Sequence, residues 1–436
     1  MEKIVSLAKR RGFVFGGSDI YGGLAGTWDY GPLGSLLKKN IKDEWWREIV
    51  QLRDDMVGVD AAIMMNPKAW EASGHVDAFS DPLVECKICH QRFRADNADE
   101  IAAHEKTHHG KAVEWTDPQK FNLLVTAYLG VVEEKKQEIF LRGEITNGAS
   151  VNFKNVVDST RIKIPFGIAQ IGKAFRNEIT PGNFIFRSRE FEQMETQYYI
   201  QPDETEAKKW FAYWKENRMK WYIDLGIRPE NLRWYEHPAD ERAHYAKAAV
   251  DIEYNSPFGW AEFMGIHHRG DWDLQRHQEY SGVDMSYNDQ ISGQKFLPYD
   301  IETSAGVDRS LLFFLIDAYR EEEKRVVLKL HPKLAPYKVA VFPLLANKPE
   351  LVAAAKKIYR DLQPHFMVAW DERGNVGKRY FAQDEIGTPY CITVDFDTLE
   401  GTKRPKGTVT VRERDSMTQE DVAIDELVAY IQKKLA

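Results

Sequence analysis

The chain has 436 residues, of which 43% are hydrophobic and 29% are charged, and its formal net charge is -8. These fractions are ordinary for a globular protein, and the length suffices for about two or three domains. The acidic balance excludes a nonspecific nucleic-acid coat, which needs a strongly basic surface, but it leaves room for local basic patches. Because no apolar run approaches the roughly eighteen residues of a membrane span, we expect no membrane partner.

Cysteine usage indicates a reducing compartment. The N-terminal sequence MEKIVSLAKRRGF has neither the apolar core nor the small-residue cleavage site of a signal peptide. Three cysteines are too few for a disulfide framework in a chain of this length, and two of them form Cys86-x-x-Cys89, which favours a metal over a disulfide. We therefore expect a cytoplasmic protein.

The first strongly periodic segment, 32–50, predicts a helix. Apolar side chains recur at Leu37, Ile41 and Trp45 with helical spacing, and Pro32 stands where a first helical turn tolerates proline. One face of this helix should be buried.

A charged, histidine-rich segment, 81–117, interrupts the periodic pattern and is interpreted as an insertion. Cys86 and Cys89 are followed, after fourteen intervening residues, by His104 and His108. These ligand types and spacings are close to those of a structural Cys2His2 zinc site, and a helix would place the two histidines one turn apart.

Two alternatives to this zinc site stay open from the residues alone. His90 and His109 compete for the histidine positions, and a charged loop with incidental histidines needs no metal. If four protein ligands do bind zinc, the site is structural, because no position is left open for catalysis.

The rest of the chain mixes helices and strands. Segment 120–140 carries both signals, 203–225 predicts a helix, 233–280 predicts short antiparallel strands, and 311–329 predicts a helix that stops at His331-Pro332. We place a domain boundary there, which divides the chain into 1–330 and 331–436. Strand and helix signals alternate in the second part and predict a small α/β domain with a largely parallel sheet.

The stretch from Gly172 to Ile200 predicts two facing strands with a turn at 181–183. Arg176 and Glu178 are two residues apart, so a strand would direct both to one face. Arginines bind phosphate oxygens, aromatic rings stack on bases and carboxylates bind amino groups, so the hairpin is a candidate nucleotide platform. The alternative is a solvated hairpin.

Three ordered motifs resemble those of the class II aminoacyl-tRNA synthetases: DYGPLG from Asp29, FRNE followed by REFE from Phe175, and GVDR from Gly306. The resemblance implies an α/β (α+β) fold. Its parts would be an antiparallel sheet flanked by helices, a zinc-finger-like insertion and a C-terminal α/β anticodon-binding domain. It also implies a homodimer built on the helix at 32–50 and a strand near 56–65.

Among these enzymes the chain most resembles the homodimeric glycyl type, in RRGFVFGGSDIYGGLAGTWDYGPLG, in SGHVDAF with DPLVECKICHQRFRAD, and in GNVGKRYFAQDEIGTPYCITVD. That resemblance implies ATP-dependent attachment of glycine to tRNA(Gly) through a glycyl-adenylate, with Mg2+ accompanying ATP. Seryl, threonyl, prolyl or histidyl specificity is the alternative within the class. A noncatalytic paralogue that binds tRNA or a protein partner is the alternative outside catalysis.

The resemblance also implies roles for individual residues. Arg176, Glu178 and Arg309 would be catalytic. The ATP-binding residues would be Arg176, Asn177, Glu178, Phe186, Arg187, Phe191, Glu262, Phe263, Gly306 and Arg309. The glycine-binding residues would be Arg94, Glu144, Glu192, Glu195, Glu302 and Ser304.

Two further segments bear on the site. Where the family has Arg-Pro-Glu-Thr-Ala-Gln-Gly, this chain has RGEITNG at 142–148, with glycine for proline at 143 and asparagine for glutamine at 147. Glycine loosens the backbone and asparagine is a shorter polar arm, so amino-acid binding is less securely predicted than ATP binding. The cluster HHRGD at 267–271 predicts a charge-paired support beside the ATP pocket rather than a metal site.

Overall fold

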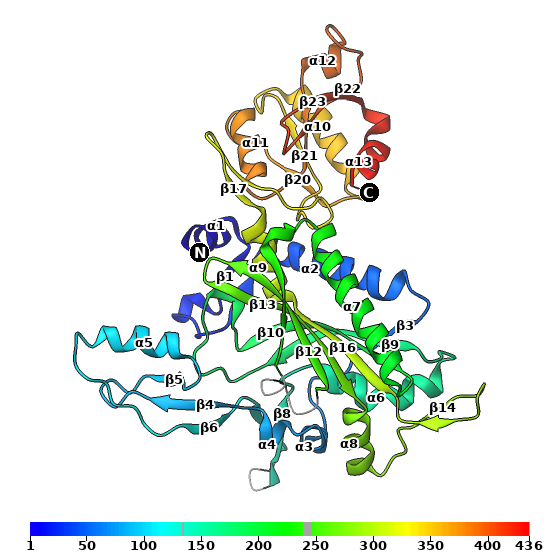
Figure 1. Ribbon diagram of the computed structural model, residues 1–436. Helices are drawn as coiled ribbons and strands as arrows, with labels where there is room; N and C mark the ends of the chain where they lie inside the picture. The colour runs from blue at the N-terminus through cyan, green and yellow to red at the C-terminus, as the bar shows by residue number, and fades with distance from the viewer. Residues whose placement is uncertain (133–134, 239–241, 243–245, 436) are drawn as a thin grey trace.

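A computed structural model describes residues 1–132, 135–238, 242 and 246–435 (Figure 1). Two hydrophobic cores are separate in space. The larger core involves residues between Ile4 and Ile386, and the smaller lies within Val339–Ile431. Figure 1 shows the smaller unit, coloured orange to red, above a larger body that contains the long antiparallel strands. No helix in the described ranges combines the length and apolar character needed to cross a membrane.

The larger body is organised by a sheet of seven described strands. Neighbouring strands are antiparallel except for the first and shortest in the chain, which pairs parallel with its neighbour. This confirms the predicted antiparallel sheet. In spatial order the strands are β11 (Leu232–Glu236), β12 (Ala248–Ser256), β13 (Gly259–Gly270), β16 (Tyr299–Gly306), β10 (Glu190–Ile200), β9 (Phe166–Phe175) and β3 (Met56–Gly58).

Helices flank this sheet, and three short strand pairs lie beside it. The helices are α1 (Glu2–Arg11), α2 (Pro32–Trp46), α3 (Pro67–Ala72), α4 (His75–Ala78), α6 (Thr146–Ser159), α7 (Glu204–Asp224), α8 (Trp272–Ser281) and α9 (Val307–Ala318). The strand pairs are β1 (Val14–Gly16) with β2 (Trp28–Tyr30), β14 (Tyr287–Asn288) with β15 (Lys295–Phe296), and β17 (Tyr319–Glu321) with β18 (Val326–Leu328).

The periodic helices form where the sequence predicts them. In α2, Leu37, Ile41 and Trp45 are fully buried, and the helix continues as a π-type turn at Arg47–Gln51. The predicted helix at 203–225 is α7, which begins where the Asp203 carboxylate accepts hydrogen bonds from two backbone amides.

Three predictions in this body need correction. The strand predicted near 56–65 is only three residues long, β3. The segment 233–280, predicted as strands, ends in the helix α8. The helix predicted over 311–329 stops at Ala318, because the chain there enters the β17–β18 hairpin.

The predicted insertion is a separate three-stranded sheet with one helix, drawn in cyan in Figure 1. Segment 120–140, which carried mixed signals, contains strands and no α-helix among its described residues. The elements of this region are β4 (Ser80–Glu85), β5 (Arg92–Arg94), α5 (Ala98–Thr107), β6 (Gln119–Asn122), β7 (Val125–Leu129) and β8 (Gln137–Leu141).

The C-terminal unit is α/β, as predicted, but its sheet is mixed rather than largely parallel. The connection between its last two strands spans only 414–418, which is too short for the crossover that parallel strands need. Its strands, in spatial order, are β20 (Val368–Trp370), β19 (Val339–Pro343), β21 (Tyr390–Val394), β22 (Thr408–Glu413) and β23 (Gln419–Ala423). Its helices are α10 (Pro349–Leu362), α11 (Val376–Asp384), α12 (Phe396–Glu400) and α13 (Leu427–Leu435).

Buried charge joins the two units. Asp384, at the end of α11, is fully buried and accepts hydrogen bonds from Arg325 Nη1 at 2.7 Å and from Arg412 Nη1 at 2.8 Å. Arg325 belongs to the loop before β18, whereas Arg412 lies on β22. Nearby, Arg11 Nη2 donates to the carbonyl of Ala382 at 2.7 Å.

The substitution Asp384→Ala should destabilise the protein strongly, because two buried guanidinium groups would lose their shared carboxylate. We expect a loss of about 3–5 kcal/mol in the free energy of unfolding, measured by denaturant titration. Asp361→Ala is the control, since its ion pair with Lys357 is solvent-exposed and should contribute about 0.5 kcal/mol or less. Equal losses in the two variants would contradict the role of Asp384.

Candidate active site

A cavity of about 170 Å³ opens on the face of the large sheet, between β10, β13, β16 and the start of α9. Most of the predicted site residues meet there, although they come from five separate segments of the chain. Those that line the cavity are Glu144, Arg176, Glu178, Phe186, Arg187, Phe191, Glu195, Glu262, Glu302, Ser304, Gly306 and Arg309.

Strand alternation separates two predicted residues from the cavity. On β10, Phe191 and Glu195 line it, whereas Glu192 points to the other face and pairs with Lys38 and Lys42 at 3.2 and 2.8 Å. Phe263 likewise turns away from the cavity and is buried in the core. Because successive strand residues face opposite sides, a contiguous motif cannot place all its members in one site.

Asn177 and Arg94 also lie outside the cavity lining. The backbone amide of Asn177 donates to the carbonyl of Leu123 at 2.8 Å. Arg94, on β5 of the insertion, is held by Asp81 at 2.9 Å and by Asp96 at 2.6 Å. The insertion therefore approaches the site without extending this arginine into it.

The two strands of the predicted hairpin are present, but its arginines do not lie on those strands as predicted. β9 ends at Phe175 and β10 begins at Glu190, so Arg176, Glu178 and Arg187 lie in the connecting loop. They nevertheless line one cavity, with Arg187 Nε 3.8 Å from a Glu178 oxygen. The loop, rather than strand periodicity, brings these side chains together.

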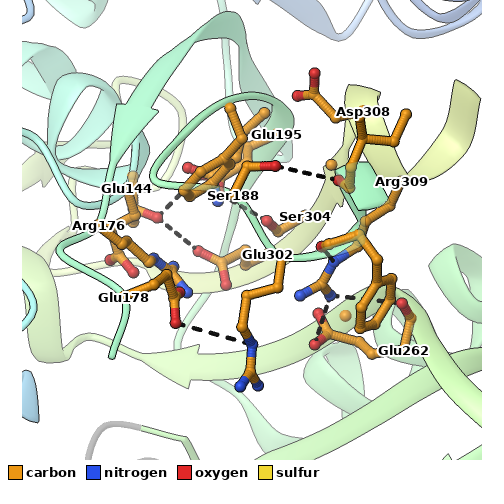
Figure 2. A pocket seen from close by; sticks show the side chains of 18 of the residues that line it. Glu144, Arg176, Glu178, Ser188, Glu195, Glu262, Glu302, Ser304, Asp308 and Arg309 are labelled. Carbon is orange, nitrogen blue, oxygen red and sulfur yellow. Dashed lines mark hydrogen bonds and ion pairs between the residues drawn. The ribbon is translucent and has the colours of Figure 1, made fainter. Parts of the chain in front are cut away.

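One side of the cavity is built around Arg309, at the start of α9. Its Nη1 lies 2.9 Å from Glu262 Oε2, and its guanidinium lies 4.4 Å from the centre of the Phe186 ring. The Arg309 charge, together with lesser contributions, lowers the pKa of Glu262 although burial opposes the shift. Figure 2 shows this pair on the side of the cavity away from Glu144.

Arg176 lies on the side of the cavity where Glu144 lies, beside an acidic cluster. Its Nε donates to the carbonyl of Gly143 at 3.0 Å, next to Glu144, and its charge helps to lower the pKa of Glu262. The guanidinium also lies between two rings, 5.0 Å from Phe79 and 5.3 Å from Phe191. A cation in this position suits an anionic group bound in the middle of the cavity.

The acidic cluster consists of Glu144, Glu195 and Glu302, whose side chains converge beside Ser304 in Figure 2. Burial alone would raise the pKa of Glu302, but Arg269 at 3.1 Å and His267 at 2.8 Å outweigh it and hold that pKa well below its usual range. Two of the three carboxylates thus have basic side chains as partners, since His75 lies 3.2 Å from Glu144.

Glu195 differs from its two neighbours because its hydrogen bonds come from neutral groups. Ser304 Oγ donates at 2.6 Å, and Thr146 Oγ1 and Gln193 Nε2 each donate at 2.9 Å. Burial, followed by repulsion from Glu302 and Glu144, raises the pKa of Glu195 to about 8. The cluster therefore has room for one more positive charge.

In the insertion, Cys86, Cys89, His104 and His108 offer ligand atoms that all lie within 4.8 Å of one another. Cys86 Sγ is 3.6 Å from His108 Nε2, Cys89 Sγ is 3.4 Å from His104 Nε2, and the two histidine nitrogens are 3.1 Å apart. Zinc bonds of about 2.0–2.3 Å would give tetrahedral edges of roughly 3.3–3.8 Å, so two thiols and two imidazoles fit this metal.

Comparisons with known proteins agree with this geometry. The family described as "Anticodon binding domain" matches residues 338–434. A glycine–tRNA ligase from Borreliella burgdorferi is 53% identical over 443 residues, covering 100% of this chain and 97% of its own length. Those from Caldanaerobacter subterraneus subsp. tengcongensis and Thermobifida fusca are 51% and 50% identical, each covering 100% of this chain and 98% of its own.

The chain belongs to the glycine–tRNA ligase family. The resemblance drawn from the three motifs is thereby confirmed, and so is the class II fold with its C-terminal anticodon-binding domain.

The departure from the family pattern at 142–148 is accommodated by the local structure. A side chain at Gly143 would place its Cβ 2.7 Å from Phe79, the ring that packs on Arg176. Glu144 still lines the cavity, and Asn147 donates a hydrogen bond to Ser73 Oγ at 2.9 Å. The segment therefore keeps Glu144 in the cavity lining despite its departures from the family pattern.

Several supporting residues were missed by sequence reasoning. Gln193 could have been found by stepping two residues from Phe191 and Glu195 along the strand. Asp308, in contrast, has a purely tertiary role: its Oδ1 accepts from Lys38 at 2.7 Å and from Tyr30, and its Oδ2 accepts from the Glu192 amide at 2.6 Å. Arg269 and His267 fulfil the predicted charge-paired support.

The raised pKa of Glu195 makes stability depend on pH. Between its unfolded value of 4.5 and about 8, the folded protein holds a proton that the unfolded chain has lost. Wild-type stability should therefore fall with rising pH in this window, by up to about 1.4 kcal/mol per pH unit from this group. Glu195→Gln, which cannot ionise, should lack this part of the decline when the free energy of unfolding is measured at several pH values.

Glu190→Gln provides the matched control on the same strand, since Glu190 is exposed and pairs with Lys173. This variant should follow the wild-type pH dependence. An unchanged slope in Glu195→Gln would show that Glu195 titrates normally.

Proposed function

We propose that the chain attaches glycine to tRNA(Gly) in two steps that use ATP. A glycine carboxylate oxygen attacks the α-phosphorus of ATP and pyrophosphate leaves, which forms glycyl-adenylate. A hydroxyl of the terminal tRNA ribose then attacks the adenylate carbonyl, and AMP leaves. The observation that carries this proposal is the acidic cluster with one uncompensated carboxylate, Glu195, beside an arginine that suits an anion.

Glycine itself matches that arrangement. Its ammonium would supply the positive charge missing from Glu195, and its carboxylate would point toward Arg176 and the phosphate. Glu144, Glu302 and Ser304 would complete the ammonium site. Thr146 Oγ1 lies 2.9 Å from a Glu195 oxygen and 3.0 Å from a Glu302 oxygen. In this position it would crowd a larger side chain and so disfavour alanine or serine.

ATP would occupy the rest of the cavity. Phe191 would stack on adenine and Glu178 would accept from its amino group, while Arg187 and Arg309 would bind the outer phosphates. Mg2+ would arrive with ATP and neutralise phosphate charge, and Glu262 of the cavity lining would lie near it. Positioning and charge neutralisation then account for most of the rate.

The quaternary and cellular setting is also proposed. The segment just before the DYGPLG motif leaves large apolar side chains exposed, Ile20 at 88% and Tyr21 at 87%. Their burial in a twofold interface supports a homodimer. The free thiols of Cys86, Cys89 and Cys391 favour a reducing cytoplasm. Residues 331–436 would read the anticodon and 1–330 would catalyse.

Glycine-dependent exchange of pyrophosphate with ATP tests the activity. Glycine should support exchange, and alanine and serine should support little. Arg309→Ala should lower kcat/KM by about 10²–10³-fold, because it removes a charge that stabilises the phosphates. Arg373→Ala, which removes a highly exposed arginine of the C-terminal unit, should change exchange less than about twofold. If no amino acid supports exchange, the proposal is overturned.

We also propose that the four insertion ligands bind one structural zinc ion. Purified protein should retain about one equivalent of zinc, measured by elemental analysis after gel filtration. Cys89→Ser should lose it, whereas Cys391→Ser should keep it, because Cys391 is buried in β21, in the other unit. Equal zinc content in the two variants would contradict the ligand assignment.

A further inference from the structure

A line of buried polar groups leads away from Glu144 into the protein, behind the cavity. His75 Nε2 lies 3.2 Å from Glu144 Oε1, and His75 Nδ1 lies 2.8 Å from Ser73 Oγ. Asn147 Nδ2 donates to Ser73 Oγ at 2.9 Å, and Asn147 Oδ1 lies 3.3 Å from His277 Nε2. Apart from Glu144, these residues lie outside the cavity lining.

Hydrogen-bonding capacity shows how each contact of this line can be satisfied. A carboxylate only accepts, so the proton between His75 and Glu144 must reside on His75 Nε2. Ser73 Oγ accepts from Asn147 and also lies 3.4 Å from the carbonyl of Trp70, so its hydroxyl can donate to that carbonyl or to His75 Nδ1. At the far end, burial lowers the pKa of His277 and favours a neutral ring that can donate from Nε2 to Asn147. His75 Nε2 is thus the donor to Glu144 whichever way the Ser73 hydroxyl turns.

The segment that carries His75 is rigidly held. The ring packs between Trp70 and Phe79, with centroid distances of 5.2 and 5.0 Å. From the insertion, Asn122 Nδ2 donates to the carbonyl of Val76 at 2.8 Å, and from α8, Arg276 Nε donates to the carbonyl of Ala72 at 3.0 Å. An imidazole fixed on three sides can fix the carboxylate that it faces.

Glu144 needs such a partner, because it is buried close to Glu302 and Glu195. Burial would raise its pKa, yet the charge and hydrogen bond of His75 lower that pKa to about 2. Besides His75, two charges act on Glu144: Arg269 lowers its pKa and Glu302 raises it. The carboxylate would then be free to rotate or to take up a proton.

We propose that His75 is a positioning residue for amino-acid binding. It holds the Glu144 carboxylate in place and ionised, so that Glu144 can accept hydrogen bonds from the substrate ammonium, and Ser73, backed by Asn147 and His277, holds the imidazole ring. This inference rests on the proposed binding of glycine at Glu144. It also assigns a role to Asn147, one of the residues at which the 142–148 segment departs from the family pattern.

The test separates glycine binding from ATP binding in pyrophosphate exchange. His75→Ala should raise KM for glycine about 10- to 100-fold, the range seen when a residue that orients a ligand group is removed. KM for ATP should stay within about twofold, because the arginines keep their contacts. His75→Gln, whose amide can still donate to Glu144, should recover much of the loss.

Two further variants keep the test informative if His75→Ala folds poorly. Ser73→Ala removes the hydroxyl that orients the ring and should raise KM for glycine about 3- to 10-fold with an unchanged thermal midpoint. His268→Ala removes an imidazole that is equally buried, at 5% exposure against 6% for His75. Its ring faces Glu204 instead, so KM for glycine should not change.

Three outcomes overturn the inference. They are an unchanged KM for glycine in Ser73→Ala and His75→Ala, an equal rise in the KM values for glycine and ATP, and the same effect in His268→Ala. In each of these outcomes the wild type would still show glycine-dependent exchange. If the wild type itself shows no exchange with glycine, the proposed function fails first, and the two failures are thus distinguished.

Discussion

The site depends on one electrostatic constraint: three carboxylates are buried within one small cavity, and each must be compensated or protonated. Arg269 and His267 compensate Glu302, and His75 lies beside Glu144. Glu195 receives hydrogen bonds from neutral groups, so its proton is held until another cation arrives. Under the proposed function, the ammonium group of an amino acid would bring that cation. The cluster has more buried carboxylates than cations, and this excess of negative charge destabilises the empty site at high pH. The same excess favours an ammonium-bearing substrate, so the stability of the fold is coupled to its ligand.

A second layer of buried charge holds the cavity walls together. Asp308 begins the helix that carries Arg309, and it is bonded to Lys38 of α2 and to the Glu192 amide of β10. Glu192 in turn pairs with Lys38 and Lys42. The three motifs are thus joined by contacts among Lys38, Lys42, Glu192 and Asp308, of which Asp308 alone lines the cavity. A motif residue that the sequence suggests as a ligand contact can instead position the residues that line the cavity.

Prediction succeeded where a local signal was strong. Helical spacing predicted α2 and α7, and the Cys-x-x-Cys and His-x3-His pattern brought four ligand atoms together. It failed for side chains whose direction depends on which face of a strand is buried, and for segments whose structure depends on a loop or turn conformation. Glu192 and Phe263 point away from the cavity because adjacent strand residues alternate. Arg176 and Arg187 lie in a loop, and loop conformations have no sequence periodicity that would predict them. In the C-terminal sheet, a short turn makes the last pair of strands antiparallel.

The sequence by itself determined the family, the class II fold and most of the residues that line the cavity, because motif spacing and residue chemistry are local properties of the chain. Only the tertiary structure decided which of those residues face one another. The line from His75 through Ser73 and Asn147 to His277 joins residues up to about two hundred positions apart. The physical reason is that hydrogen bonds and charges act over a few ångströms in space, so their partners are selected by packing and not by separation along the chain.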